Sequence, residues 1–111
     1  MRQTLLFLCL FTASSLLAQS WTPIADLPLG KHHLVTFTLD SKGYAVSGTS
    51  ALSTTSDDFY EYDPVLDTWT AIADFPGAAR SFAIGLEYNG KGYLGFGAST
   101  SQVLNDLWQY D

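Results

Sequence analysis

Apolar and polar residues alternate with a period of two along most of the chain beyond its N-terminal segment. The clearest case is the stretch SFAIGLEY, in which Phe82, Ile84, Leu86 and Tyr88 occupy every second position. A period of two places these four side chains on one face of an extended strand. No stretch in this part of the sequence has the 3.6-residue period of an amphipathic helix. The pattern therefore predicts an all-β chain built of short strands.

Turn residues separate the predicted strands. Asn89 and Gly90 follow the strand at 81–88, and both residues accept the positive φ that a tight hairpin requires. Two further strands follow them, GYLGFG and NDLWQYD. The first half of the chain has the same order: HLVTFTLD, a turn predicted at 41–43, YAVSG, a Ser/Thr-rich loop at 49–56, and DFYEYD. There the chain continues through the turn PVLD into a fourth strand, TWTAIA.

The sequence repeats itself at a spacing of 48 or 49 residues. Residues 21–28, WTPIADLP, and 69–76, WTAIADFP, are identical at six of eight positions. The pair GY recurs, and DFYEYD recurs as DLWQYD. We place one extra residue in the first turn of the second copy, which aligns His32 with Arg80. Four short antiparallel strands in about 40–50 residues are typical of one blade of a β-propeller.

The spacing of the repeated residues resembles that of a known family. A strand that begins with Gly-Tyr ends in glycine, Tyr62-Asp63-Pro64 closes the next strand, and Trp69 stands seven residues after Tyr62. Together with ADFPGAAR, this order resembles kelch repeats, above all those of secreted bacterial kelch proteins, across residues 21–111. The paired glycines usual in that family are each reduced to one: Ser47-Gly48 and Phe96-Gly97. The resemblance implies an all-β partial kelch propeller of four-stranded antiparallel blades, about two of which are present.

The repeat also predicts how the chain is divided. We expect a signal peptide at 1–18 and a propeller segment at 19–111. That segment would hold three parts: a blade-closing strand at 20–25, a complete blade at 33–72 and an incomplete blade at 81–111. Propellers have four to eight blades, so two blades would leave apolar faces and strand edges open to water. We therefore expect a piece of a longer kelch protein or, as the alternative, self-association of several copies through the open blade faces.

The first eighteen residues have the composition of a secretory signal peptide. Arg2 is their only charge, a mostly apolar run extends over 5–17, and the small residue Ala18 ends the segment. A basic start, an apolar run and a small-residue end are the three regions of such a peptide. A membrane anchor is the alternative, but thirteen residues fall short of the ~20 that a spanning helix needs. The sequence predicts cleavage after Ala18 and a secreted, periplasmic or cell-surface protein without a transmembrane anchor.

Charge and cysteine content exclude several classes of function. Arg2 and Cys9 both lie in the predicted signal peptide, so the exported chain has no cysteine and four basic residues against eleven acidic ones. Without a thiol there is no disulfide, no Cys-based zinc site and no thiol nucleophile. Nucleic acids and anionic membranes are bound through clusters of Lys and Arg, and the sequence has no such cluster. We expect neither as a partner.

The aromatic and histidine residues most invite a functional interpretation. Trp21 and Trp69 recur at the repeat period, so we interpret them as wedges between blades rather than sugar-stacking platforms. His32 and His33 are adjacent, and neighbours on a strand point to opposite faces, so they are not expected to share a metal ion. Asp57-Asp58 lacks the alternating spacing of a calcium loop. Because phosphate loops and nucleophile elbows are also missing, the sequence predicts no catalytic, metal-binding or cofactor-binding residue.

These observations favour a noncatalytic, secreted module that binds a glycan or a protein. The ligand would meet the loops at one end of the propeller, residues 49–56 and 98–105. The alternative is part of a periplasmic kelch enzyme such as a sialic acid epimerase, in which Arg80 would bind the sugar carboxylate or, on the other interpretation, hold the blades together. Kelch copper radical oxidases that resemble galactose oxidase need a cysteine bonded to a tyrosine, which the exported chain lacks. A third hypothesis is a structural subunit of a cell-surface assembly.

Overall fold

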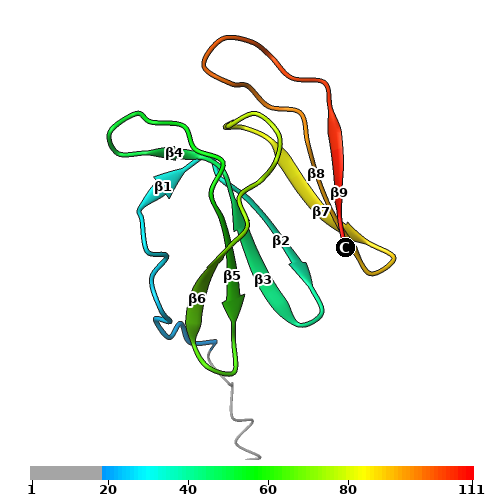
Figure 1. The fold of residues 1–111 in the computed structure, drawn as a ribbon. Coiled ribbons are helices and arrows are strands. Elements are labelled where there is room, and N and C mark those ends of the chain that lie inside the picture. Colours follow the sequence, from blue (N-terminus) through cyan, green and yellow to red (C-terminus); the bar gives the residue numbers. More distant parts are fainter. Residues whose placement is uncertain (1–18) are drawn as a thin grey trace, which may run out of the picture.

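The computed structural model describes residues 19–111, so the predicted signal peptide and its cleavage site lie outside the described residues. Short strands follow one another along this part of the chain (Figure 1): β1 (Lys31–His32), β2 (Val35–Leu39), β3 (Lys42–Val46), β4 (Thr49–Ser50), β5 (Phe59–Asp63), β6 (Thr68–Ile72), β7 (Ile84–Tyr88), β8 (Lys91–Gly95) and β9 (Leu107–Tyr110). Within residues 19–111, no helix is long and apolar enough to span a membrane.

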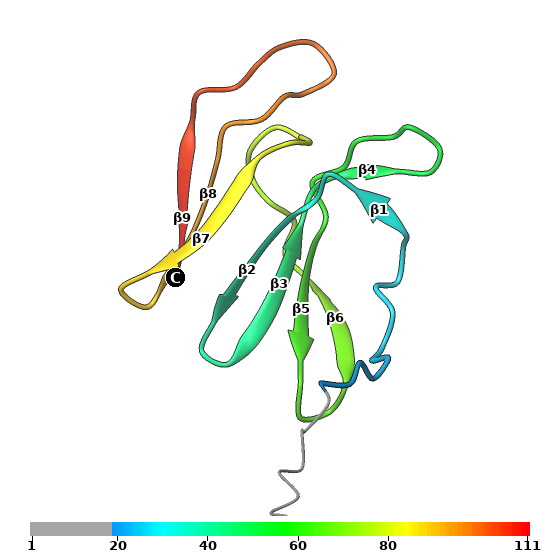
Figure 2. The ribbon, with the colours of Figure 1, turned by 180° about the vertical axis from the view of Figure 1, so that it is seen from behind.

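The strands form two larger antiparallel sheets and one small one. The strands β2, β3, β5 and β6 make a four-stranded sheet, which we call blade 1, and β7, β8 and β9 make a three-stranded sheet, which we call blade 2. The strands β1 and β4 pair separately beside one end of blade 1. Figure 1 and the reverse view in Figure 2 show the two blades side by side. The all-β prediction and the four-stranded antiparallel blade are confirmed.

Equivalent hairpins join the first two strands of each blade. In blade 2, Asn89 and Gly90 form the predicted turn, with φ values of 52° and 72°. In blade 1 the turn consists of Asp40 and Ser41, with φ values of 49° and 64°, and β3 already begins at Lys42. The prediction of a turn at 41–43 was therefore wrong. Asp tolerates the left-handed conformation well, so the two-residue turn forms one position earlier without a central glycine.

The blades pack face to face, and the register of blade 1 selects the residues at the interface. Val35 pairs with Val46 and Phe37 pairs with Tyr44, so these four side chains lie on one face of the sheet. That face is buried against blade 2, with exposed fractions between 2% and 7% for these residues. Within residues 19–111, the core contains eight buried residues: Val35, Phe37, Leu39, Tyr44, Val46, Phe59, Phe75 and Leu94.

Glycine permits the close approach of the two blades. A Cβ atom on Gly85 would lie 2.5 Å from Val35 Cγ1 and 2.9 Å from the carbonyl oxygen of Thr36. Gly92 faces the ring of Phe37 in the same way. These glycines in strands mark a close backbone approach between sheets, which a side chain would prevent.

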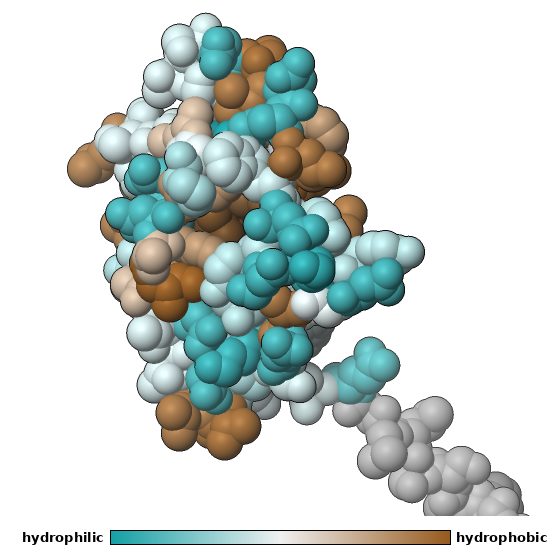
Figure 3. Space-filling view, turned by 45° about the vertical axis from the view of Figure 1, so that its right-hand side comes forward, coloured by the Kyte–Doolittle hydropathy of each residue, from teal (hydrophilic) through white to brown (hydrophobic). Residues whose placement is uncertain are grey.

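The opposite face of blade 2 is apolar and exposed. One face of β7 carries Ile84, Leu86 and Tyr88, as the alternating pattern predicted. These residues are every second one along β7, and they pair with every second residue along β8, so all three side chains point the same way. Their exposed fractions are 53%, 48% and 63%, whereas the equivalent residues of blade 1 are buried. Figure 3, which brings the β9 side of the molecule forward, shows hydrophobic surface exposed among hydrophilic side chains.

Residues 20–25 do not form the blade-closing strand that the repeat predicts. They pair with no strand and instead run beside blade 1, where the backbone N–H of Ala25 donates to Asp67 Oδ1 at 2.8 Å and its carbonyl accepts from Trp69 Nε1 at 3.0 Å. Trp69 is half-buried, and its ring lies 5.0 Å from that of Tyr62. Trp21, in contrast, is 99% exposed and meets no blade among residues 19–111, so its role as a wedge between blades stays a prediction. The hydrogen bonds of Ala25 to Asp67 and Trp69 hold the segment beside β6 without ladder pairing, and a strand needs that pairing.

Candidate functional site

Both loops that the sequence proposed for ligand binding lie at the same end of the blades. The loop at 49–56 begins with β4, and the loop at 98–105 joins β8 to β9 (Figure 1). Backbone bridges hold both loops: Thr49 pairs with Thr55, and Ala98 pairs with Ser81 and Val103. We call this surface the loop end.

An aromatic pair from the two blades lies at the loop end. The rings of His33 and Phe82 have centroids 3.9 Å apart, and the N–H of Phe82 donates to the carbonyl of His33 at 3.2 Å. His33 has a φ of 54° and Phe82 a φ of 60°. Positive φ values are uncommon for residues other than glycine, above all for bulky ones. The two residues precede the first long strand of each blade and are 49 positions apart, so the same backbone geometry is repeated. Phe82 keeps an exposed fraction of 64%.

The two adjacent histidines meet, contrary to the prediction from strand geometry. Nδ1 of His32 lies 2.6 Å from Nδ1 of His33. The prediction that they point to opposite faces was wrong because His33 leaves the strand with a positive φ, which ends the alternation. Within residues 19–111, no third His, Cys, Asp or Glu joins them in a group that would hold a metal ion.

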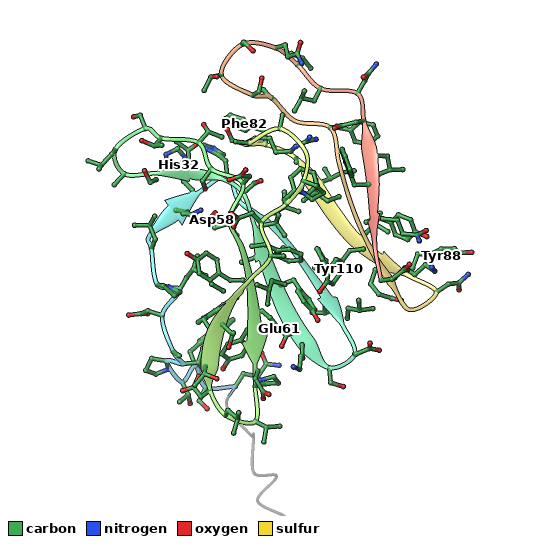
Figure 4. All side chains as sticks on the ribbon, in the orientation of Figure 1. His32, Asp58, Glu61, Phe82, Tyr88 and Tyr110 are labelled. Atoms are coloured by element: carbon green, nitrogen blue, oxygen red, sulfur yellow. The ribbon has the colours of Figure 1, made fainter. Side chains whose placement is uncertain are left out.

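Hydroxyl groups lie near the aromatic pair. Oγ1 of Thr49 donates to Oγ of Ser81 at 3.2 Å and lies 3.4 Å from Oγ1 of Thr55. Ser81 is buried and immediately precedes the exposed Phe82, so the half-buried hydroxyls of Thr49 and Thr55 lie near the exposed ring. Figure 4 shows His32, Phe82 and Asp58 toward this end of the blades, with Tyr88 toward the other.

Arg80 is fully buried behind the loop end and forms a two-pronged ion pair with Asp106. Its Nη1 and Nη2 atoms donate to the two carboxylate oxygens at 2.5 and 2.7 Å, and Nη1 also donates to the carbonyl of Phe96 at 3.1 Å. The guanidinium lies 4.9 Å from the centre of the Phe75 ring. The Arg80 hydrogen bonds hold the pKa of Asp106 at about 2, well below its usual value. Since these contacts occupy Arg80 within the protein, it is not placed to bind a ligand carboxylate.

Lys31 makes the equivalent ion pair in blade 1. Its ammonium group pairs with Asp58 and contacts the carbonyl of Ser47 at 3.3 Å and Oγ of Ser56 at 2.5 Å. Asp58 and Asp106 each stand immediately before the third strand of their blade. The structural counterpart of Arg80 is therefore Lys31, and the alignment of Arg80 with His32 was wrong. Lys31 and Arg80 are 49 residues apart, whereas Trp21 and Trp69 are 48 apart. The extra residue of the second copy therefore lies before Arg80.

A separate polar cluster lies on blade 1, away from the loop end. Glu61 accepts a hydrogen bond from the Tyr44 hydroxyl at 3.0 Å and pairs with the Lys42 ammonium at 2.5 Å. The Lys42 hydrogen bond lowers the pKa of Glu61. Burial, helped by Glu61, raises the pKa of Tyr44. All three groups have partners, so the cluster stabilises the pairing of β3 with β5.

Comparison with known proteins identifies the fold. No protein-family model matches the sequence, and no curated protein matches it. Among solved structures, the chain is similar to the structure of YjhT, with a TM-score of 0.64 and 21% sequence identity. The similarity covers 72% of this chain and 25% of the YjhT chain, so this chain spans a quarter of that length. With the strand order and register, the similarity shows that the described chain has the fold of part of a kelch β-propeller.

The aromatic pair is the feature of the loop end that sequence reasoning missed. A repeat alignment with the extra residue one position earlier would have set Lys31 opposite Arg80 and His33 opposite Phe82. That alignment indicates equivalent positions but not contact. The contact follows from the packing of the two blades, which brings residues 49 positions apart together.

Proposed function

We propose that this chain is part of an exported, noncatalytic propeller that binds a carbohydrate at the loop end. The exposed Phe82 ring, packed at a tilt against His33 near the half-buried hydroxyls of Thr49 and Thr55, carries this proposal. A sugar ring has one apolar face that stacks on an aromatic ring and hydroxyls at its rim that exchange hydrogen bonds with side-chain hydroxyls. The export part of the proposal rests on the composition of residues 1–18.

Backbone strain gives the aromatic pair additional weight. Positive φ costs a bulky residue about 1–3 kcal/mol, and such strain is often found where a side chain is held for function. The same strain occurs at His33 and Phe82, so each copy of the repeat places an exposed aromatic side chain at the loop end. A ligand would then find a preformed platform.

The ion pairs support binding without catalysis. Lys31 and Arg80, the cations nearest this surface, are each held by an aspartate within the protein. General acid or base chemistry needs a group that is free to exchange its proton with substrate. The fold alone does not assign an activity.

Carbohydrate binding can be tested with a glycan array followed by calorimetry on each hit. We expect Phe82→Ala to weaken binding of a hit at least tenfold, because the stacking face is lost. Val65→Ala is the matched control, since Val65 is 89% exposed in the turn between β5 and β6, at the opposite end of blade 1. Equal binding by wild type and Phe82→Ala, or no glycan bound at millimolar concentration, would reject the proposal.

A second candidate function is part of a periplasmic sugar-epimerising enzyme. The observation in its favour is the contact between His32 and His33, because two imidazoles at an exposed surface can pass protons to and from a sugar. The chain, or the longer protein if it is part of one, would then interconvert the anomers of sialic acid, which NMR follows directly. His33→Phe keeps an aromatic ring beside Phe82 but removes the proton-exchanging group. Turnover that this variant loses would favour the enzyme over the binding protein.

A further inference from the structure

The hairpin between β7 and β8 contains a chemically reactive pair of residues. Asn89 and Gly90 form its turn, with φ values of 52° and 72°, and both are exposed. When glycine follows asparagine, the backbone nitrogen of the glycine can attack Cγ of the asparagine, because no side chain on the glycine hinders the approach. The other asparagine of the sequence, Asn105, is followed by Asp106 instead. Asn89 is therefore the asparagine at which this reaction meets least hindrance.

The reaction would have two steps, with water as the co-reactant. In the first, the Gly90 nitrogen gives up its proton and forms a bond to Cγ of Asn89, and the side-chain nitrogen of Asn89 leaves with that proton as ammonia. In the second, water opens the resulting five-membered imide ring at either carbonyl. One opening gives aspartate, and the other gives isoaspartate, in which the backbone runs through the side-chain carbon. The first step therefore requires a Gly90 nitrogen that has lost its proton.

A carboxylate holds the proton that has to leave. The backbone N–H of Gly90 donates to Oε1 of Glu87 at 2.7 Å. A hydrogen bond to a carboxylate is stronger than one to a neutral acceptor, and it favours the state in which the donor keeps its proton. The negative charge of the carboxylate also disfavours a second negative charge on the nitrogen beside it. Both effects oppose the first step of the reaction.

We propose that Asn89 is a site of spontaneous deamidation and that Glu87 protects it by holding the Gly90 N–H. Glu87 is a positioning residue in this proposal, since it acts through the Gly90 backbone and does not touch Cγ of Asn89 in the reaction. The site is separate from the proposed carbohydrate surface. Figure 4 shows Tyr88, the residue before Asn89, at the other end of the blades from Phe82.

Blade 1 shows that the hairpin accommodates aspartate at this position. Its equivalent turn consists of Asp40 and Ser41, with φ values of 49° and 64°, so an aspartate adopts the conformation that Asn89 has in blade 2. The residue equivalent to Glu87 is Thr38, 49 positions earlier, which has no carboxylate. The protecting carboxylate thus occurs in the blade whose turn has an amide to protect. Conversion of Asn89 to aspartate should leave the fold unchanged.

The isoaspartate product would disturb the packing of the blades. It adds one carbon to the backbone inside a two-residue turn, next to the pairing of Tyr88 with Lys91. Immediately after Lys91, Gly92 lies so close to blade 1 that a Cβ atom on it would be 2.4 Å from Cε2 of the buried Phe37 ring. A shift of β8 at this point would press the backbone against that ring. Protection of Asn89 therefore preserves the register of β8 and the contact between the blades.

The rate of deamidation tests the proposal on the full chain. During incubation at mildly alkaline pH, conversion raises the mass by about one dalton, and peptide mapping assigns the change to Asn89 or to the internal control Asn105. We expect Glu87→Ala to speed conversion of Asn89 in the folded chain about tenfold, as loss of a hydrogen bond to a charged group predicts, and to leave Asn105 unchanged. In urea, wild type and Glu87→Ala should react at the same rate, because the contact exists only in the folded hairpin. Equal rates for the two folded proteins, or slower reaction of the variant, would overturn the proposal.

A matched variant separates loss of the carboxylate from loosening of the hairpin. Lys91→Ala removes the exposed ion pair with Asp111 beside the same turn and should leave the rate at Asn89 unchanged. Glu87→Gln keeps an acceptor oxygen without the charge, so its rate should fall between those of wild type and Glu87→Ala. If Lys91→Ala speeds the reaction as much as Glu87→Ala does, opening of the hairpin sets the rate and the assignment of Glu87 is wrong.

Discussion

Lys31 and Arg80 occupy the same position in the two blades, 49 residues apart. Each is a buried cation that pairs with the aspartate immediately before the third strand of its blade. Each also donates to the carbonyl of a positive-φ residue, Ser47 or Phe96. The side chains differ in chemistry, but the role is the same. The repeat therefore conserves an ion pair that links the beginning of each blade to its third strand.

Arg80→Ala should destabilise the protein, because it leaves Asp106 without its partner. We expect a loss of about 2–3 kcal/mol in the free energy of unfolding, below the range for fully buried pairs because Asp106 is 35% exposed. Arg80→Lys should lose only about 1 kcal/mol, since Lys31 performs the same role in blade 1. Urea unfolding measures both.

The control for this comparison is Lys91→Ala, which removes the exposed ion pair with Asp111. It should change stability by no more than about 0.5 kcal/mol. A similar loss for Lys91→Ala and Arg80→Ala would show that burial of the ion pair does not matter.

Stability should fall in acid partly through Asp106. Its pKa is about 2 in the folded protein and higher when unfolded, so the unfolded chain binds a proton first as the pH falls. The contribution of Asp106 is complete at pH values above the usual aspartate pKa and is lost progressively as the pH falls through about 2. Thermal unfolding measured between pH 2 and pH 7 should therefore show a smaller acid-induced drop in Tm for Asp106→Asn than for wild type. Parallel curves for the two proteins would contradict this assignment.

Gly85→Ala should separate the blades. The added Cβ would meet Val35 and the Thr36 backbone, and the backbone cannot move aside as a flexible side chain would. We expect a loss of about 1–3 kcal/mol, typical of overpacking. Gly30→Ala is the matched control, because a Cβ at Gly30 has no atom within 4 Å, and its effect should be close to zero. Denaturant unfolding of the two variants gives the comparison directly.

Asp67 anchors the N-terminal segment to blade 1. It accepts hydrogen bonds from the Ala25 backbone and the Tyr62 hydroxyl, and these hydrogen bonds lower its pKa. Asp67→Ala should release the segment and speed proteolytic cleavage within 19–28 severalfold, at a cost of about 1–2 kcal/mol. Asp67→Asn, which keeps an acceptor and tolerates the φ of 51°, should retain most of the protection. Equal cleavage rates for wild type and Asp67→Ala would rule out the anchor.

Local pattern was sufficient to predict the blade. Alternation of apolar residues gave β2 and β7, and Asn89-Gly90 gave the hairpin of blade 2, because both signals act within a few residues. The same reasoning placed the turn of blade 1 too late. Asp40 and Ser41 form the turn with positive φ, whereas the prediction expected the glycine at position 43 to supply that conformation. It also predicted a strand at 20–25, because a strand-like sequence does not reveal whether a ladder partner is near.

By itself the sequence determined the repeat unit, the all-β fold and the face on which each strand side chain lies, because these depend on the period of two and on turn residues close in the chain. The tertiary structure decided what covers each face. Val35 and Ile84 have the same repeat position, yet one is 2% exposed and the other 53%, because burial requires a neighbouring blade. It also brought together His33 and Phe82, and Arg80 and Asp106, because packing between distant segments selects contacts that no local pattern encodes.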